Sequence, residues 1–264
     1  MIKISDKNYV IYHLHSDLSN GVTNIDSVTK YHEYIDYASK NNMKALGFSE
    51  HGSILEWVHK KTKIESKGMK YIYAEEFYVT EQLYFEPDVT ELCESLLGVD
   101  EQEEQEQIIE FIENNKTQKR DNYHVVLIAK NYDGVVELNE LSSRGFQRDG
   151  HFYYNPRISF DELISTSDNI IVCTACVGGI LASGTKEIQE KFLKFLIENK
   201  HRCYLEVQHH NDDMQIKYNQ YLSMISKKYI LPQIKILLLV TMKNLEKNIK
   251  IKKLCLNTLK LISI

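Results

Sequence analysis

The sequence predicts an α/β protein whose parallel sheet is either open or closed into a barrel. Short runs rich in β-branched and aromatic residues alternate with amphipathic segments, and repeated strand–helix units of this kind favour parallel strands. The length of 264 residues suits one large domain, because single α/β barrels commonly reach this size. No internal sequence repeat is evident.

The first half of the chain contains strand and helix signals in alternation. A helix is predicted over residues 26–40, where apolar side chains recur at helical spacing and two asparagines follow as a stop. A second helix, 54–67, ends at Gly68, which suits a helix C-cap. Short apolar runs predict strands over residues 9–12, 45–49 and 71–74.

Residues 82–122 interrupt the alternation of strands and helices and form a predicted acidic helical insertion. The segment contains a Glu/Gln-rich run, 101–110, and closes with basic residues at 116–120. Such charge patterns are typical of a solvated helix or a flexible excursion.

Alternation resumes after the insertion. Residues 123–129 have the composition of a strong strand, and residues 145–156 that of a loop. The other predicted strands cover 169–173 and 203–207, and the helices cover 133–142, 185–199 and 213–228.

The composition is that of an ordinary globular protein, with 43% hydrophobic and 26% charged residues. A net charge of −5 argues against broad coating of nucleic acid, although metal ions can still provide a local phosphate site. Five cysteines at irregular spacing predict no disulfide framework. No signal peptide is visible, and the longest apolar run, 236–240, is too short to span a bilayer. We therefore expect a soluble, cytoplasmic protein.

Residues able to bind a metal fall at or near the predicted strand ends. Residues two apart in a strand share a face, so His13 and His15 can converge on one ion. In α/β barrels the C-terminal ends of the strands form the rim that carries active sites. His, Glu and Cys together have the ligand chemistry of zinc, iron or manganese. The pattern consists of His13, His15, His51, Glu76, His124 and Cys176.

Each of these residues taken alone has a structural alternative. His124 within an apolar strand is more commonly a satisfied core histidine, and one His-x-His pair is not specific for metal. Cys173 and Cys176 form a single Cys-x-x-Cys without a second pair, so Cys173 is best explained as a buried thiol. The repeated placement at successive strand ends favours the metal site.

Four motifs in order along roughly residues 8–230 resemble the PHP (polymerase and histidinol phosphatase) domain family. The similarity is closest to the N-terminal PHP domain of the bacterial or phage DNA polymerase III alpha subunit. This resemblance implies a distorted (β/α)7 barrel that binds up to three divalent metal ions, Zn, Mn or Fe, at the strand C-termini. The motifs are His-Leu-His-Ser-Asp at 13–17, Ala-Leu-Gly-Phe-Ser-Glu-His-Gly at 45–52, Tyr-His-Val-Val-Leu-Ile-Ala at 123–129 and Thr-Ala-Cys-Val-Gly-Gly at 174–179.

The resemblance also assigns roles to individual residues. Asp26 replaces the family's next acidic ligand after a short insertion, with a helix cap as its alternative. Glu50 and Glu75 are expected as supporting neighbours of ligands, and Glu76 as the carboxylate that bridges two ions. The implied metal ligands are His13, His15, Asp26, His51, Glu76, His124 and Cys176, of which Glu76, His51 and His124 are the predicted catalytic residues.

Residues 208–210 resemble a Gln-Asp-His sequence of the family. Gln208, His209 and His210 follow a predicted strand and are expected on the rim, where they would meet substrate. The alternative is that they are plain loop residues.

The chain departs from the family after about residue 231. The family continues with a strand and an Asp-x-His pair, its last two ligands, whereas residues 232–264 contain no Asp, His or Gly. We interpret this divergent tail as the result of a frameshift. Residues 236–240 could still form the missing strand, so the resemblance predicts a closed barrel with fewer metal ions.

The function implied by the resemblance is metal-dependent phosphoester hydrolysis in DNA replication and proofreading, as a 3′–5′ exonuclease acting on a DNA 3′ end. Other replisome subunits are the expected partners, no membrane is expected, and no polymerase region is present. Two alternatives remain open: a free-standing small-molecule phosphatase of the histidinol phosphatase type, and a non-catalytic structural module of a polymerase.

Overall fold

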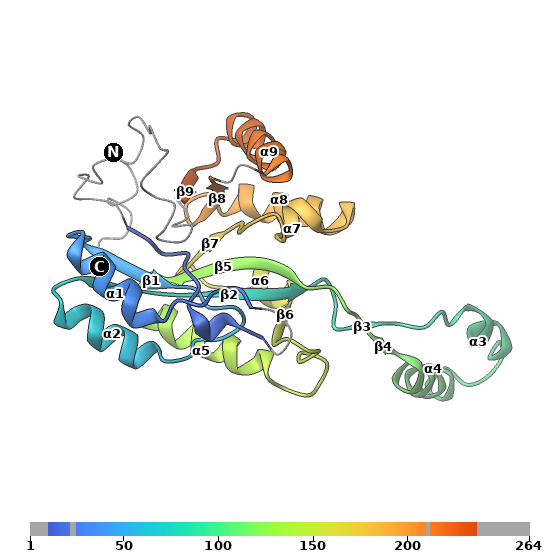
Figure 1. Cartoon of the computed structure of the whole chain (residues 1–264). Coiled ribbons are helices and arrows are strands. Elements are labelled where there is room, and N and C mark those ends of the chain that lie inside the picture. The colour runs from blue at the N-terminus through green and yellow to red at the C-terminus, as the bar shows by residue number, and fades with distance from the viewer. Residues whose placement is uncertain (1–9, 22–24, 210–211, 237–264) are drawn as a thin grey trace.

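One curled sheet dominates the computed structural model, which describes residues 10–21, 25–209 and 212–236 (Figure 1). The strands follow the order β1-β2-β5-β7-β8-β9, and β6 lies beside the end of β2. Residue Ile11 bridges Leu46 in parallel, so the N-terminal segment extends the β1 edge. The seven strands of this sheet in the described part of the chain are β1 (Ala45–Phe48), β2 (Lys70–Thr80), β5 (Tyr123–Ala129), β6 (Arg157–Ser159), β7 (Ile170–Cys173), β8 (Cys203–Gln208) and β9 (Gln233–Ile236).

The expectation of an all-parallel sheet is wrong for one strand. β5 runs antiparallel to both of its neighbours, β2 and β7, while the pairs β1–β2, β7–β8 and β8–β9 are parallel. Two consecutive parallel strands need a crossover that carries the chain from the end of the first strand back to the opposite end of the sheet. The segment after β2 instead leaves and re-enters the sheet at the same end, so β5 starts near the end of β2 and runs antiparallel to it.

Helices cover the outer face of the sheet. The predicted helices occur, with ends that differ by a few residues. The short elements α6, α7 and β6 were not predicted, because segments of so few residues are too short to show a hydrophobic period. No helix in the described ranges has both the length and the hydropathy to cross a bilayer. The α-helices of the described chain outside the insertion are α1 (Tyr31–Lys40), α2 (Trp57–Ser66), α5 (Tyr132–Gly145), α6 (Phe160–Ile164), α7 (Ile180–Ser183), α8 (Lys186–Glu198) and α9 (Asp213–Tyr229).

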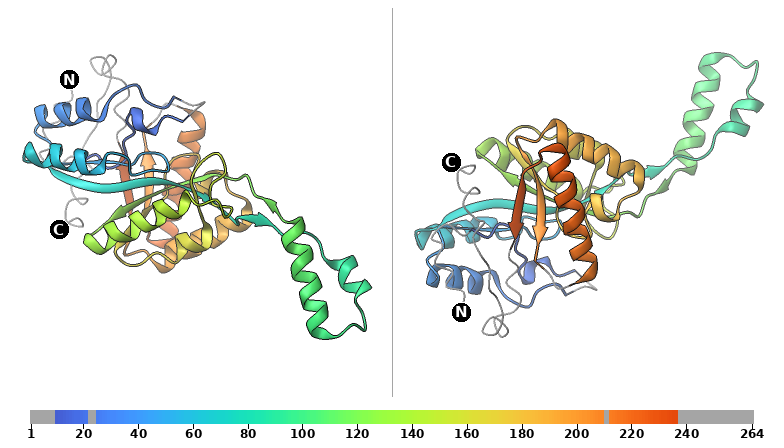
Figure 2. Two further views of the ribbon diagram at one scale, coloured as in Figure 1. Left: turned by 90° about the horizontal axis from the view of Figure 1, so that it is seen from below. Right: turned by 90° about the horizontal axis from the view of Figure 1, so that it is seen from above.

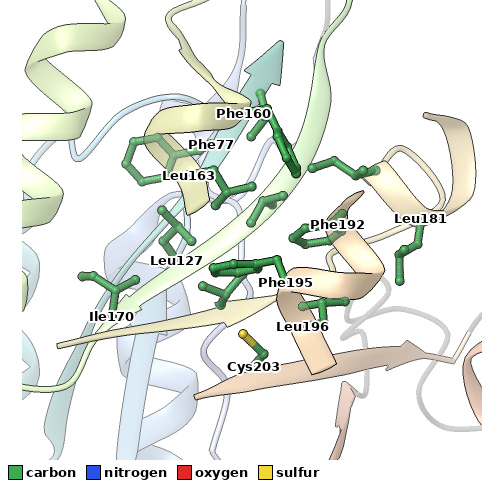
Figure 3. Packing of buried hydrophobic residues seen from close by; sticks show 14 of the residues in the cluster. Phe77, Leu127, Phe160, Leu163, Ile170, Leu181, Phe192, Phe195, Leu196 and Cys203 are labelled. Atoms are coloured by element: carbon green, nitrogen blue, oxygen red, sulfur yellow. The ribbon is translucent and has the colours of Figure 1, made fainter. Parts of the chain in front are cut away.

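The side chains of the sheet form two apolar layers. On the outer face, Leu127 and Ile170 pack against helix residues such as Phe160, Phe192 and Leu196 (Figure 3). The inner cluster takes residues from every strand of this sheet except β6, which is only three residues long, and it also includes Tyr12. Its members are Tyr12, Ala45, Ile72, Ala74, Val126, Ile128, Ile171, Cys173, Ala175, Tyr204 and Ile234.

The inner cluster defines the shape of the sheet. Tyr12 near one end of the strand order and Ile234 near the other belong to the same cluster, so the sheet curls around a common interior. The α/β fold class is confirmed, and this curled half-barrel fits the expected distorted barrel. The expected strand at 236–240 overlaps β9 at Ile236, and residues 237–240 lie outside the described residues.

The predicted insertion forms an arm that projects from the body (Figures 1 and 2). Its base is a two-stranded sheet of β3 (Tyr84–Phe85) and β4 (Thr117–Gln118). Beyond it lie α3 (Thr90–Ser95) and α4 (Glu101–Asn115), and α4 has no buried residue.

Arg157 ties the base of the arm to the sheet. Its guanidinium is fully buried and donates hydrogen bonds to the backbone carbonyls of Lys119, Asp121, Gly150 and His151, at 2.8 to 3.2 Å. One side chain thus satisfies the carbonyls of two loops at once.

Replacing Arg157 with methionine should destabilise the fold by about 3 kcal/mol or more, because each buried carbonyl left without a donor costs about 1–3 kcal/mol. Urea denaturation measures this loss. Arg148→Met, which changes an exposed arginine in the segment before β6, is the control. Equal free energies of unfolding for the two variants would contradict this role of Arg157.

Candidate metal centre

The metal-capable side chains gather at one edge of the curled sheet. Glu76 faces the interior because it follows Ile72 and Ala74 at alternate positions of β2. His124 comes second in β5, at the start of a strand rather than at its end. The antiparallel direction of β5 nevertheless brings His124 to the edge where β1 and β2 end. The expectation that His124 lies near a strand C-terminus is therefore wrong, although its place on the rim agrees with the prediction.

His13, His15 and Glu76 form the first group. Glu76 Oε2 lies 3.0 Å from His13 Nε2 and 2.9 Å from His15 Nε2, and the two imidazole nitrogens are 3.1 Å apart. Histidine nitrogens and a carboxylate oxygen this close need a proton or a cation between them. These three side chains could hold one metal ion.

His51, Glu76 and His124 form the second group. Glu76 Oε1 lies 2.9 Å from His124 Nδ1, and Glu76 Oε2 lies 3.5 Å from His51 Nδ1. Glu76 Oε1 and His51 Nδ1 are nevertheless buried without a hydrogen bond of good geometry. Buried polar atoms without partners are rare, so their convergence fits a divalent cation. Glu76 belongs to both groups, which is the arrangement a bridging carboxylate requires.

Asp26 and Cys176 lie at the margins of these groups. Asp26 Oδ2 is 3.2 Å from His51 Nε2, and Cys176 Sγ is 3.6 Å from His124 Nδ1. Within the described residues, neither belongs to the two compact groups. The helix-cap alternative for Asp26 is wrong, because Lys30 occupies the N-cap of α1.

Glycine at position 179 allows the turn that carries Cys176 to approach the strand. A Cβ at Gly179 would lie 2.4 Å from the Thr174 carbonyl oxygen and 3.2 Å from that of His124. The backbone of Ala175 in the same turn adopts a positive φ of 55°. The Thr-Ala-Cys-Val-Gly-Gly motif therefore brings its thiol to His124 through close backbone contact.

Glu206 in β8 is a site residue that the sequence analysis missed. Its side chain is completely buried and accepts hydrogen bonds from His13 Nδ1 at 2.6 Å, Tyr12 Oη at 3.1 Å and Gln208 Nε2 at 2.6 Å. With Nδ1 engaged, the Nε2 atom of His13 faces Glu76. A carboxylate in this position orients a ligand histidine and increases its basicity. The signal available in the sequence was alternation, since Glu206 shares a face with the buried Tyr204.

The predicted substrate rim at residues 208–210 needs correction. Gln208 is buried, and its amide holds Glu206, so it does not stand on an open rim. His209 is exposed and lies beside α9, in a groove that also contains Met224. His210 lies outside the described residues.

Glu50 supports the rim as expected. It accepts hydrogen bonds from Ser16, Ser19 and the buried ammonium of Lys60, whose Nζ lies 2.7 Å away. Burial would raise the pKa of Glu50, but Lys60 and the two serines lower it. The carboxylate therefore stays charged and holds the segment that carries His13 and His15.

Glu75 does not support the metal groups, and that prediction is wrong. Alternation along β2 directs it to the outer face, where Ser142 Oγ lies 3.3 Å from Glu75 Oε1. Burial raises the pKa of Glu75 well above its ordinary value. Burial therefore favours the neutral form of this carboxyl group in the helix-facing layer.

The charges around Glu76 show what a cation would replace. Burial would lower the pKa of His13, but Glu206 and Glu76 raise it well above its ordinary value. Burial lowers the pKa of His51 to about 4, whereas Cys176 and Glu76 overcome burial and raise the pKa of His124 to about 10. Burial would raise the pKa of Glu76, but His13, His124 and His15 hold it well below its ordinary value. Metal binding would release the protons that now compensate Glu76.

Comparison with known proteins adds independent information. A protein-family model described as "PHP domain" matches residues 12–210. The DNA polymerase III subunit alpha of Aquifex aeolicus is 28% identical over 228 residues, and that of Borreliella burgdorferi is 26% identical over 229 residues. These alignments cover 84% and 85% of this chain but only 17% of each relative. The chain therefore matches about a sixth of their length.

A solved structure described as a metal-dependent phosphoesterase from Bifidobacterium adolescentis is also similar. Its TM-score is 0.46 at 12% sequence identity, and the alignment covers 86% of both chains.

Replacing Glu206 with glutamine should weaken metal binding about 10–100-fold, because it removes the carboxylate that orients His13. Tyr12→Phe, which removes one hydrogen bond to Glu206, should have a smaller effect in the same direction. Competition with a chromophoric chelator measures both affinities, and circular dichroism verifies folding. Glu187→Gln on the exposed face of α8 is the control. Unchanged affinity in folded Glu206→Gln protein would refute the orienting role.

Proposed function

The chain belongs to the PHP domain family, and on that premise we propose that it hydrolyses phosphoester bonds with divalent metal ions held at the His–Glu rim. The observation that carries the proposal is the position of Glu76, whose two oxygens are shared by two groups of histidines. Two ions bridged by one carboxylate are a recurrent arrangement in enzymes that cleave phosphate esters.

The side chains of the rim favour particular metals. Imidazole ligands suit zinc, iron and manganese, and a thiolate from Cys176 would favour zinc or iron. When bound, such ions would polarise a phosphate oxygen and lower the pKa of a nearby water molecule. Asp26 and Cys176 are proposed as additional ligands beside His51 and His124.

The protein's own residues prepare the rim for this chemistry. Glu206 fixes the ring of His13 through Nδ1, so its Nε2 is directed at Glu76. The low pKa of His51, about 4, keeps its ring neutral at neutral pH and leaves Nδ1 available as a ligand. His124, with a pKa of about 10, must give up a proton before it can bind a metal ion.

The proposed substrate is a DNA 3′ end, which makes the reaction that of a 3′–5′ exonuclease in replication and proofreading. This choice is supported by the relatives, which are named as alpha subunits of DNA polymerase III. Polymerisation is not proposed, because the matched region is a small part of those proteins.

The divergent tail limits the number of ions. Residues 232–264 lack the Asp-x-His pair that the resemblance places at the end of the ligand set. We expect the two groups that share Glu76 to retain metal and a further ion to bind weakly.

Elemental analysis tests the metal centre. Purified protein should contain zinc, iron or manganese, and His13→Ala should reduce the content strongly because it removes one of three ligands in the first group. Cys176→Ala should cause a smaller loss, since its sulfur lies at the margin. His59→Ala, an exposed histidine of α2, is the control. A metal content that neither His13→Ala nor Cys176→Ala changes would refute the cluster.

Activity assays with manganese or zinc test the substrate. The protein should release nucleotides from 3′-end-labelled DNA, and His13→Ala should lower the rate by at least tenfold, because positioned metal ions lower the barrier by several kcal/mol. Cleavage of histidinol phosphate without cleavage of DNA would favour the small-molecule phosphatase. Metal-loaded protein that cleaves neither substrate but binds a polymerase would favour the structural module.

A further inference from the structure

Helix α4 of the arm exposes an apolar side chain within a strongly acidic surface. No residue of α4 is buried, and Ile109 is 61% exposed. Glu106 and Glu113 flank Ile109 at the helical positions i−3 and i+4, and Glu110 follows it. Over residues 82–115 the chain has eleven acidic residues and no Lys, Arg or His. Helices in proteins gain most of their stability from the packing of an apolar face, so α4 presents a surface that the described chain does not cover.

An open groove of about 890 Å³ lies beside α9 on the body of the protein. Ile216, Met224 and Lys227 line it at helical spacing, on the side of α9 opposite its buried residues. Ile216 is 42% exposed and Met224 is 57% exposed. The described lining also includes Lys228 and His209 but no acidic residue. The groove thus combines exposed apolar side chains with positive charge.

The two lysines of the groove have no acidic partner in the described chain. Both are exposed near the end of α9, where positive charge also suits the helix dipole. Lys228 Nζ lies 4.9 Å from the ring centroid of Tyr229, and no carboxylate among the described residues lies within ion-pair distance of Lys227 or Lys228. The dipole accounts for the lysines but not for the exposed Ile216 and Met224. The groove is therefore complementary to α4 in charge, and both surfaces expose apolar side chains.

A contact between α4 and the groove requires two copies of the chain. The arm points away from the body and from α9 in every view (Figures 1 and 2). The two surfaces also match in length at 1.5 Å per residue, because α4 extends over about 22 Å and the segment from Ile216 to Lys228 over about 18 Å.

We propose that α4 of one copy docks in the α9 groove of a second copy, with Ile109 against Met224. The carboxylates of α4 then lie beside Lys227 and Lys228. When each copy also receives the other's arm, two identical contacts close a two-fold dimer. Nucleic acid fits less well, because phosphates would pair with the lysines but leave the apolar side chains of the groove uncovered. Two α4 helices would repel each other, so the partner of α4 is the groove rather than a second arm.

Sedimentation equilibrium of the full-length protein at low salt tests the proposal. EDTA in the buffer excludes contacts bridged by metal ions, so the result does not depend on the proposed phosphoesterase activity. The protein should self-associate. Raising the salt to about 1 M, where the Debye length falls to about 3 Å, should weaken the association at least tenfold. Protein that stays monomeric at submillimolar concentration overturns the proposal.

Two charge-reversal variants identify the surfaces. Glu106→Lys/Glu110→Lys changes the arm, and Lys227→Glu/Lys228→Glu changes the groove. Each variant alone should associate at least tenfold more weakly, because its arm and groove carry charge of the same sign. Mixing the two variants should restore association, since the arm of each then meets a groove of opposite charge. A mixture of folded variants that is no heavier than the separate proteins overturns the proposal.

Further variants separate specific contacts from general effects of charge. Glu187→Lys/Glu190→Lys makes the same change in net charge as the arm variant at exposed positions of α8, and it should leave association unchanged. Ile109→Ser should weaken association by removing the apolar anchor, whereas Val58→Ser, which changes an exposed valine of α2, should not. Circular dichroism verifies folding in each case. A monomer that binds single-stranded DNA through Lys227 and Lys228 would overturn the proposal and assign the groove to nucleic acid.

Discussion

The buried charge of Glu76 is the constraint on which the rest of the site depends. A carboxylate that is 99% buried is costly unless positive charge surrounds it. Nitrogens of His13, His15 and His124 lie about 3 Å from its oxygens and provide that charge when they are protonated. The same side chains can exchange their protons for divalent cations. In the folded protein, either protons on these histidines or bound metal ions can compensate the negative charge of Glu76. Protons and metal ions compete for the same histidine nitrogens.

The direction of β5 determines whether this arrangement can form. The sequence predicts the strand 123–129 correctly, and it also identifies His124 as a rim residue. Strand signals carry no information about direction, so β5 was expected to run parallel, with His124 near its C-terminal end. The arm returns the chain to the same end of the sheet at which β2 finishes. β5 therefore runs antiparallel to β2, and His124 at its start lies close to Glu76. The arm projects away from the body, yet it has a topological role in building the rim.

Short-range patterns predicted the fold class and the residues that converge at the rim, because ligands sit in local motifs next to strong strands. Contacts between distant strands were not predictable in this way. Glu206 reaches His13 across 193 positions of sequence, and only the curl of the sheet brings them together. Glu75 and Gln208 were misplaced for a simpler reason, because alternation along β2 and β8 was not applied to them. Such alternation would have assigned Glu75 to the outer face and Gln208 to the interior.

Glu206 also connects the metal groups to the closure of the sheet. Tyr12 and His13 belong to the N-terminal segment beside β1, whereas Glu206 belongs to β8, so their hydrogen bonds cross the interior between distant positions of the strand order. A ligand that binds only the folded state stabilises it by mass action. Because an ion bound to His13 would require the ring orientation that Glu206 imposes, metal binding would stabilise the same contacts that hold the two sides of the curl together. Metal binding is therefore expected to stabilise the interior of the sheet and its rim together.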